Sequence, residues 1–244
     1  MRFSKPRSTW QEAFLLPNGR RTTIHFVQNA KAKRLILRLD PKSREPRLTL
    51  PQNADITNAR NFIKQNAAWL STQLDRPAQE LVVGGLLPWD GKTLMITTKN
   101  HGPIEISGNA LCVPQSRDLV QAISRFITSE ARMDMAPRVA RLVTTLRSVD
   151  AGDWSVEKIR ITDTRSRWGS CSSRRVISLS KRLMMAPEWI REYVCAHEVA
   201  HLAHPNHSEE FWSLCQKLTP AISPKTARNY LKRHGPDFFA VALV

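Results

Sequence analysis

The chain has 244 residues, of which 41% are hydrophobic and 24% are charged, as is ordinary for a soluble globular protein. No stretch approaches the roughly 18 apolar residues of a membrane span, and the first residues lack the apolar run of a secretory signal. The four cysteines include no CxxC pair. We therefore expect a cytoplasmic protein with reduced thiols, no membrane association, no disulfide framework and no cysteine-clamped zinc site.

The charge is strongly positive, with 37 Lys and Arg against 21 Asp and Glu, a formal net charge of +16. Part of this excess lies early, because residues 1–76 hold 15 basic and 5 acidic residues. Such a field attracts DNA, other polyanions or acidic proteins, although it also serves simply to keep a protein soluble. Both interpretations stay open at this point.

The first part of the chain is predicted to be rich in strands. Residues 20–50 contain three apolar, partly alternating segments that are typical of strands. A helix is expected from Asp55, which can cap it, to Leu70. Residues 81–113 return to short strands separated by turn residues. We therefore predict a small basic β-rich N-terminal lobe over residues 1–113.

From about residue 114 the pattern changes to helices with a few strands. Residues 117–147 have apolar positions at helical spacing, so they form either one long helix interrupted near Pro137 or two helices in sequence. Strands are expected around residues 157–163 and 176–180. A helix begins at Pro187 and Glu188, and a short one follows at residues 208–220. The fold class is α+β, with a second domain over residues 114–244.

The segment HEVAH, residues 197–201, predicts a zinc site. Residues four apart on a helix share one face, so His197 and His201 present two imidazoles to one ion. Glu198 lies about 100° around the helix, where it can act as general base for water held by the metal. The apolar residues between the two histidines fit a buried active-site helix.

Two histidines compete for the role of third ligand. His204 lies about 10 Å along the helix axis from His197, and Pro205 disfavours helical geometry at His204, so the helix is expected to stop there. His207 follows the proline and can fold back toward the metal. We therefore assign one Zn²⁺ ion to His197, His201 and His207, with a fourth position for water.

The sequence over residues 155–235 resembles the YgjP-like metallopeptidase family, which is related to the SprT-like and Wss1-like zincins. The resemblance is carried by an RWGSC segment, a strand, a proline-started helix with HExxH and an NHS-x-x-FW tail, found here at Arg167–Cys171, 176–180, 187–201 and Asn206–Trp212. It implies a zincin-like C-terminal catalytic lobe, and it also implies His207 as third ligand. Val199 replaces the usual Leu within HExxH, and Ser180 stands where the family usually has Asn, which leaves the role of that position open.

Several further residues are candidates for the site. An oxyanion or substrate contact is open to four of them: Tyr193, Arg165, Arg167 and His204. Cys171 is either a metal ligand or structural, and we favour the structural role. Phe211 and Trp212 are expected to pack the last helix against the metal helix. By analogy with zincins, residues 176–180 are the candidate strand edge for an extended peptide substrate.

The function predicted from these residues is a zinc-dependent metallopeptidase that cleaves peptide or protein substrates, with Glu198 as general base. The alternative is a basic, nucleic-acid-associated zinc-binding protein, or a protease acting on DNA-bound proteins. An intact glutamate beside the first histidine favours the enzyme, because a purely structural zinc site has no use for a base there.

Overall fold

The computed structural model describes residues 9–40, 43, 45–75, 79–115, 118–164 and 167–243. The packing divides the chain into two compact units, Met1–Pro77 and Ala78–Val244. The sequence pattern places residues 81–113 with the N-terminal lobe, whereas the strands that form there belong to the second unit. The architecture is mixed α+β, as predicted from the sequence.

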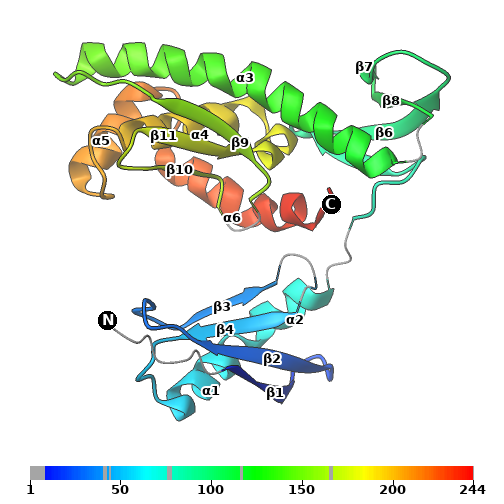
Figure 1. Cartoon of the computed structure of the whole chain (residues 1–244), viewed down its shortest axis with the longest axis vertical. Helices are drawn as coiled ribbons and strands as arrows, with labels where there is room; N and C mark the ends of the chain where they lie inside the picture. Colours follow the sequence, from blue (N-terminus) through cyan, green and yellow to red (C-terminus); the bar gives the residue numbers. More distant parts are fainter. Residues whose placement is uncertain are drawn as a thin grey trace, which may run out of the picture. The chain divides into compact units, whose positions relative to one another are not determined.

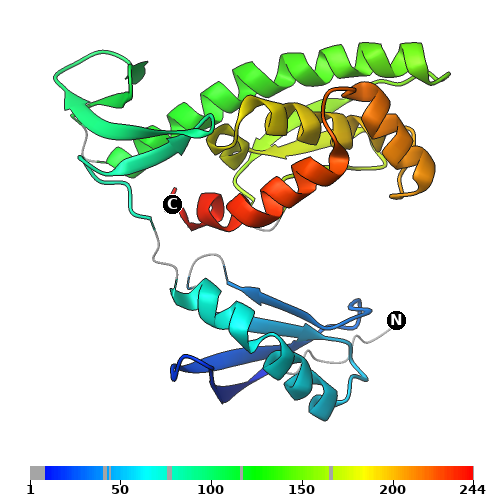
Figure 2. The same cartoon turned by 180° about the vertical axis from the view of Figure 1, so that it is seen from behind.

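The first unit is a mixed four-stranded sheet with two helices along one of its faces (Figures 1 and 2). Its strand order is β1-β2-β4-β3, with β2 and β4 parallel and the other two pairs antiparallel. The elements are β1 (Thr9–Leu15), β2 (Arg21–Gln28), β3 (Ile36–Leu39), β4 (Pro46–Leu50), α1 (Ile56–Gln65) and α2 (Ala67–Asp75).

The core of this unit lies between the sheet and the helices. Ile24 and Phe26 of β2 are fully buried, and Ile63 packs in the same cluster. Asp55 caps α1 as expected, accepting a hydrogen bond from the backbone N–H of Thr57. The single helix predicted up to Leu70 is wrong, because the chain leaves helical geometry at Asn66, whose side chain donates to the carbonyl of Phe62. Asparagine competes in this way with helix continuation.

The second unit holds two small sheets and five helices within its described residues. The first sheet has the order β5-β6-β8-β7 and the second the order β10-β11-β9. The strands are β5 (Leu86–Trp89), β6 (Lys92–Lys99), β7 (Glu105–Ser107), β8 (Ala110–Pro114), β9 (Lys158–Thr162), β10 (Gly169–Cys171) and β11 (Val176–Ser180). The helices are α3 (Leu119–Val149), the 3-10 helix η1 (Lys181–Met185), α4 (Glu188–Ala200), α5 (Glu209–Leu218) and α6 (Pro224–Ala240).

Helix α3 is continuous over 31 residues and contains Pro137 in its interior. Proline removes the N–H that would bond to the carbonyl four residues earlier, here that of Met133. Both Pro137 and Met133 are exposed, so water can satisfy this carbonyl. The opposite face of the helix stays buried at helical spacing, which holds the two halves in line. Of the two arrangements left open by the sequence, the single helix is therefore the one that forms.

The turn between β5 and β6 fixes the N-terminus of α4. Asp90 and Gly91 both have positive φ, at 50° and 71°, as a tight hairpin requires. A Cβ on Gly91 would lie 2.7 Å from the ring of Pro187, so glycine permits the close approach. The Asp90 carboxylate pairs with the buried guanidinium of Arg191 at 2.8 Å. These contacts explain why the first sheet belongs to the same unit as α4.

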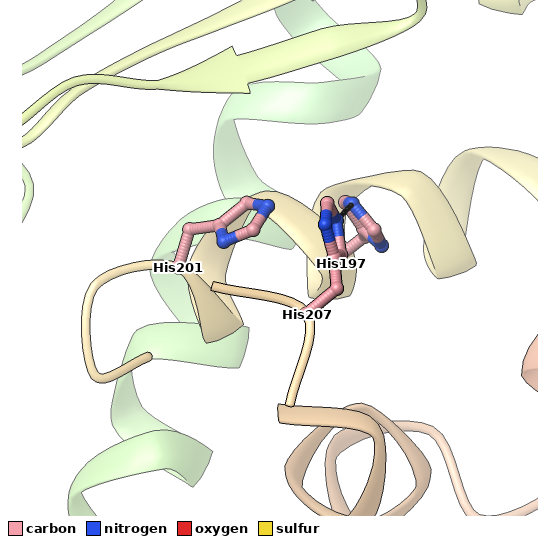
Figure 3. A group of neighbouring side chains, drawn as sticks. All are labelled: His197, His201 and His207. Atoms are coloured by element: carbon pink, nitrogen blue, oxygen red, sulfur yellow. Dashed lines mark hydrogen bonds between the residues drawn. The ribbon is translucent and has the colours of Figure 1, made fainter. Parts of the chain in front are cut away.

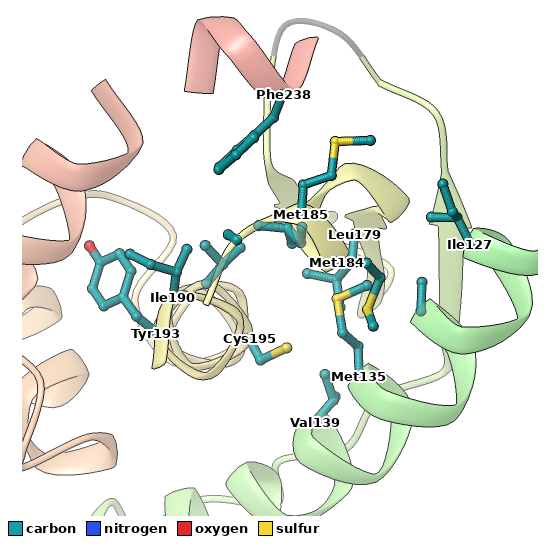
Figure 4. Close-up of a cluster of buried hydrophobic side chains, with 14 of the residues drawn as sticks. Ile127, Met135, Val139, Leu179, Met184, Met185, Ile190, Tyr193, Cys195 and Phe238 are labelled. Atoms are coloured by element: carbon teal, nitrogen blue, oxygen red, sulfur yellow. The ribbon is translucent and has the colours of Figure 1, made fainter. Parts of the chain in front are cut away.

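The core of the second unit is one continuous apolar cluster around α4 (Figure 4). Ile127, Met135 and Val139 of α3 face Leu179 of β11 and Met184 of η1. The long helix α6, which the sequence analysis did not predict, closes the cluster through Phe238. Across the described residues, no helix has both the length and the apolar character that a bilayer span requires.

Candidate metal centre

Helix α4 carries the first four residues of the HEVAH segment, His197 to Ala200. Pro187 occupies its N-cap position and Glu188 its first turn, where an acidic side chain is favourable. The helix was expected to run to His204, but it ends at Ala200, with His201 as its C-cap and turns over residues 201–203. The backbone N–H of His204 still bonds to the carbonyl of Ala200 at 2.9 Å, so the chain leaves the helix by a tight turn.

Three histidines converge at the end of α4. One ring nitrogen from each of His197, His201 and His207 lies within 4.8 Å of the others. The Nε2 atoms of His197 and His207 are 3.1 Å apart, and in Figure 3 the ring of His201 points toward that pair. Two nitrogens bound to one tetrahedral zinc are separated by about 3.4 Å. The cluster is therefore close to the geometry that one zinc ion needs.

The main chain after α4 orients His201. Its Nδ1 lies 3.0 Å from the carbonyl oxygen of His204. With the proton on Nδ1, His201 donates this hydrogen bond and keeps the lone pair of Nε2 free for a metal. His204 thus acts through its backbone, while its half-buried imidazole lies outside the group of three.

Two aromatic rings of α5 pack against the histidines. The ring of Phe211 lies 4.5–4.9 Å from all three imidazoles and is fully buried. Trp212 is stacked on His207, with centroids 5.3 Å apart and an interplanar angle of 21°. Ser208 caps α5 by accepting from the N–H of Phe211, directly after His207. Both aromatics therefore fix the imidazole positions, which goes beyond the helix packing predicted for them.

The environment keeps the imidazoles of His197 and His207 neutral. Burial lowers the pKa of His197 to about 3, with further lowering from His201, His207 and Arg228. Burial, His201 and Arg228 also lower the pKa of His207. Neutral imidazole is the form that binds a metal, and a donor set of three histidine nitrogens suits zinc. The residues present thus fit a zinc ion in both geometry and chemistry.

Glu198 lies beside the cluster and faces β10. Its side chain is only 4% exposed, and its Oε2 has no hydrogen-bond partner among the described residues. Burial raises the pKa of Glu198 to about 8, against a lowering effect of the Arg167 charge. A Cβ on Gly169 would lie 2.5 Å from Oε1 of Glu198, so the carboxylate occupies the space that any larger residue at 169 would fill.

The comparisons with known proteins identify the family. The family described as YgjP-like, metallopeptidase domain matches residues 33–234. The chain belongs to the YgjP-like family. It is accordingly a metallopeptidase, a hydrolase that uses a metal and acts on peptides or proteins.

Other comparisons add little to the family match. The crystal structure of the metallopeptidase zymogen of Pyrococcus abyssi abylysin is similar at 23% identity, covering 39% of this chain and 93% of that one, with a TM-score of 0.33. A TM-score this low does not establish a shared fold. No curated protein matches the chain.

The RWGSC segment of this YgjP-like domain links β10 to α6. The ring of Trp168 stacks on Phe239 with centroids 4.2 Å apart, and Gly235 leaves room for its edge, because a Cβ there would lie 2.7 Å from the ring. Cys171 is half-buried and lies outside the three-histidine group. Burial and the charge of Glu198 raise its pKa to about 11, so it stays a thiol at neutral pH.

Ser180, whose role the sequence left open, has a local structural role. It is fully buried, and its N–H donates to the carbonyl of Trp168 at 2.8 Å. Its hydroxyl donates to the carbonyl of Thr164 and accepts from the N–H of Arg182 at the start of η1. The residue therefore ends β11 and caps the 3-10 helix.

The edge predicted at residues 176–180 is wrong. These residues form β11, which is the middle strand, paired antiparallel with β10 and parallel with β9. The backbone groups on both of its edges are thus already hydrogen-bonded to neighbouring strands. Among the described strands, β10 lies next to Glu198 and pairs with one neighbour in its sheet, β11.

The other candidate contacts have different placements. Arg167 is exposed, but its charge acts on Glu198. Tyr193 is 2% exposed, with its hydroxyl unpartnered among the described residues, in the core one turn before His197. Arg165 lies outside the described residues. The sequence did not single out Arg228 of α6, whose guanidinium carbon lies 4.8 Å from the centroid of the Trp212 ring. No local sequence signal connects this arginine to the histidines.

Proposed function

We propose that this metallopeptidase binds one zinc ion through His197, His201 and His207 and uses Glu198 as its general base. The convergence of the three ring nitrogens within 4.8 Å of one another is the observation that carries the proposal. Zinc held there would act as a Lewis acid toward the scissile carbonyl and lower the pKa of a bound water.

Glu198 supplies the proton transfers. Its carboxylate takes a proton from the attacking water, whose oxygen forms a bond to the carbonyl carbon while the π electrons move to the carbonyl oxygen. When the C–N bond breaks, those electrons return and the leaving nitrogen receives the proton from Glu198. A nearby cation lowers a carboxyl pKa, so a bound ion and Arg167 together would keep this buried group ionised at neutral pH.

The substrate backbone is proposed to lie along β10. An extended peptide can add to a free strand edge through main-chain hydrogen bonds. Since Gly169 of β10 lies against the carboxylate of Glu198, a peptide paired with this strand would bring its backbone close to the general base.

The proposal is tested with two substitutions. Glu198→Gln should retain about one zinc per chain but cleave fluorescein-labelled casein 10²- to 10⁴-fold more slowly, as expected for loss of a principal acid/base. His207→Ala should lose both zinc and activity, and a chelator should inactivate the wild type until zinc is restored. Zinc loss in Glu198→Gln would show that the carboxylate is a ligand and would contradict its assigned role.

The alternative function, a nucleic-acid-associated protein, is supported only by the net charge of +16. The family match does not support it, since that family is described as a metallopeptidase. A steep fall in DNA affinity with salt would support it.

A further inference from the structure

Trp168 connects strand β10 to the C-terminal part of helix α6. Its ring stacks on that of Phe239, with centroids 4.2 Å apart and an interplanar angle of 22°, and meets the ring of Phe238 edge-on at 6.3 Å. Stacked and edge-to-face pairs are arrangements that aromatic rings prefer. The backbone carbonyl of Trp168 accepts a hydrogen bond from the N–H of Ser180 at 2.8 Å, so the same residue is also held on β11.

Helix α6 leaves room for this ring. A Cβ on Gly235 would lie 2.7 Å from Cζ2 of Trp168, which is too close for a real contact. The ring cannot simply turn away, because Phe239 covers one of its faces. Gly235 and Pro236 both disfavour the interior of a helix. The sequence of α6 thus favours the contact with Trp168 over the stability of the helix by itself.

The part of α6 that contacts Trp168 is fixed within its unit. The fully buried guanidinium of Arg182 donates to the carbonyls of Phe238 and Val241 at 2.8 Å each, and it pairs with Asp163 at 2.6 Å. The side chain of Phe238 points into the apolar cluster around α4 (Figure 4). The ring of Trp168 therefore packs on a firmly held support.

Strand β10 needs such a support because it is short. Its three residues, Gly169–Cys171, pair with residues 177–179 of β11. Gly169 directly follows Trp168, and a Cβ there would lie 2.5 Å from Oε1 of Glu198. A shift of β10 away from α4 would free the carboxylate to leave its position, and a displacement of about 1 Å at a catalytic group can cost about 10²-fold in rate.

We propose that Trp168 is a positioning residue for peptide cleavage, which fixes β10 on α6 and thereby keeps Gly169 against the carboxylate of Glu198. This inference rests on the proposed role of Glu198 as general base. Trp168 acts through the strand, because its ring packs on α6. Its removal should therefore leave the zinc ligands in place and slow the chemical step.

A purely structural role would have a different signature. A ring that only stabilised the fold would lower the Tm when removed, while protein that is still folded and zinc-loaded would cleave at the wild-type rate. A positioning role lowers kcat in fully folded, zinc-loaded protein. It also makes the losses caused by Trp168→Ala and Glu198→Gln non-additive, because the two residues act as a unit.

The experiment compares Trp168→Ala and Trp168→Phe with the wild type, and Trp168→Ala also in the Glu198→Gln background. Trp189→Ala is the matched control, since that ring packs on Tyr230 of the same helix at 5.3 Å but belongs to α4. Zinc content is measured by atomic absorption and Tm by calorimetry. The kcat is measured by cleavage of fluorescein-labelled casein well below the lowest Tm.

Trp168→Ala should keep about one zinc per chain and lower kcat about 10- to 10²-fold, with no further loss in the Glu198→Gln background. Trp168→Phe should retain more of kcat, because phenylalanine keeps part of the stack on Phe239. Trp189→Ala should lower the Tm and leave kcat near the wild-type value.

Gly235→Ala tests the contact between the ring and α6. In the wild type the added Cβ should displace the ring, so that both Tm and kcat fall. Trp168→Phe removes the six-membered ring that meets residue 235. In that background alanine, a better helix former than glycine, should raise the Tm and leave kcat unchanged.

An unchanged kcat in zinc-loaded Trp168→Ala would overturn the inference, and so would losses from Trp168→Ala and Glu198→Gln that simply add. Loss of zinc in Trp168→Ala would also overturn it, because the ring would then support the metal ligands. A wild type that binds zinc but cleaves nothing would instead refute the proposed function, so the two failures are distinguishable.

Discussion

Gly169→Ala is the most direct perturbation of the general base. The added Cβ would lie 2.5 Å from Oε1 of Glu198 and 2.7 Å from its Cδ and Cγ, whereas ordinary contacts begin at 3.4 Å. Glu198 must therefore move by about 1 Å, a displacement that can cost about 10²-fold in rate at a catalytic group. Because the metal ligands are untouched, zinc content should stay at the wild-type value.

The same substitution should also affect stability in a way that depends on Glu198. Overpacking typically costs about 1–3 kcal/mol, and the entropic gain from Gly→Ala offsets about 0.4–1 kcal/mol of this. With Glu198→Ala as background the obstructing carboxylate is gone, so Gly169→Ala should be neutral or slightly stabilising. The four proteins of this cycle give the coupling energy between the two sites.

Differential scanning calorimetry of the zinc-loaded proteins measures the cycle, with about 2–4 °C in Tm per kcal/mol for a unit of this size. Ser170→Ala, at the next position of β10, is the matched control and should leave Tm and activity near wild type. An equal effect of Gly169→Ala in both backgrounds would refute the close approach of Glu198 to this strand.

Two other predictions concern stability away from the reacting groups. Arg182→Met should lower the free energy of unfolding by about 3–5 kcal/mol, which would be measured as a lower Tm. The reason is that the fully buried guanidinium pairs with Asp163 at 2.6 Å and donates to the carbonyls of Phe238 and Val241. An unchanged Tm would mean that α6 is held in place without these contacts. Pro137→Ala should increase the free energy of unfolding by up to about 3 kcal/mol and so raise the Tm, because it restores a helical hydrogen bond in α3. A lower Tm would show that the proline is needed at this position.

Local sequence patterns predicted most of the helices and strands that surround the metal centre. The strand at 176–180 and the helix starting at 188 follow from periodicity and helix-start signals that involve only neighbouring residues. Helix α6 was missed because Gly235 and Pro236 interrupt its pattern. Its glycine is explained only by the ring of Trp168, which lies 67 positions earlier in the chain.

The sequence by itself determined that two histidines share one face at the end of a helix and that a third follows a proline, because those relations depend on a few adjacent residues. Only the tertiary structure decided that β11 is a central strand, that Gly169 makes room for Glu198 and that Arg228 reaches Trp212. Strand order and the approach of distant side chains result from many weak packing contacts summed over the whole unit. No short segment of the chain contains that sum.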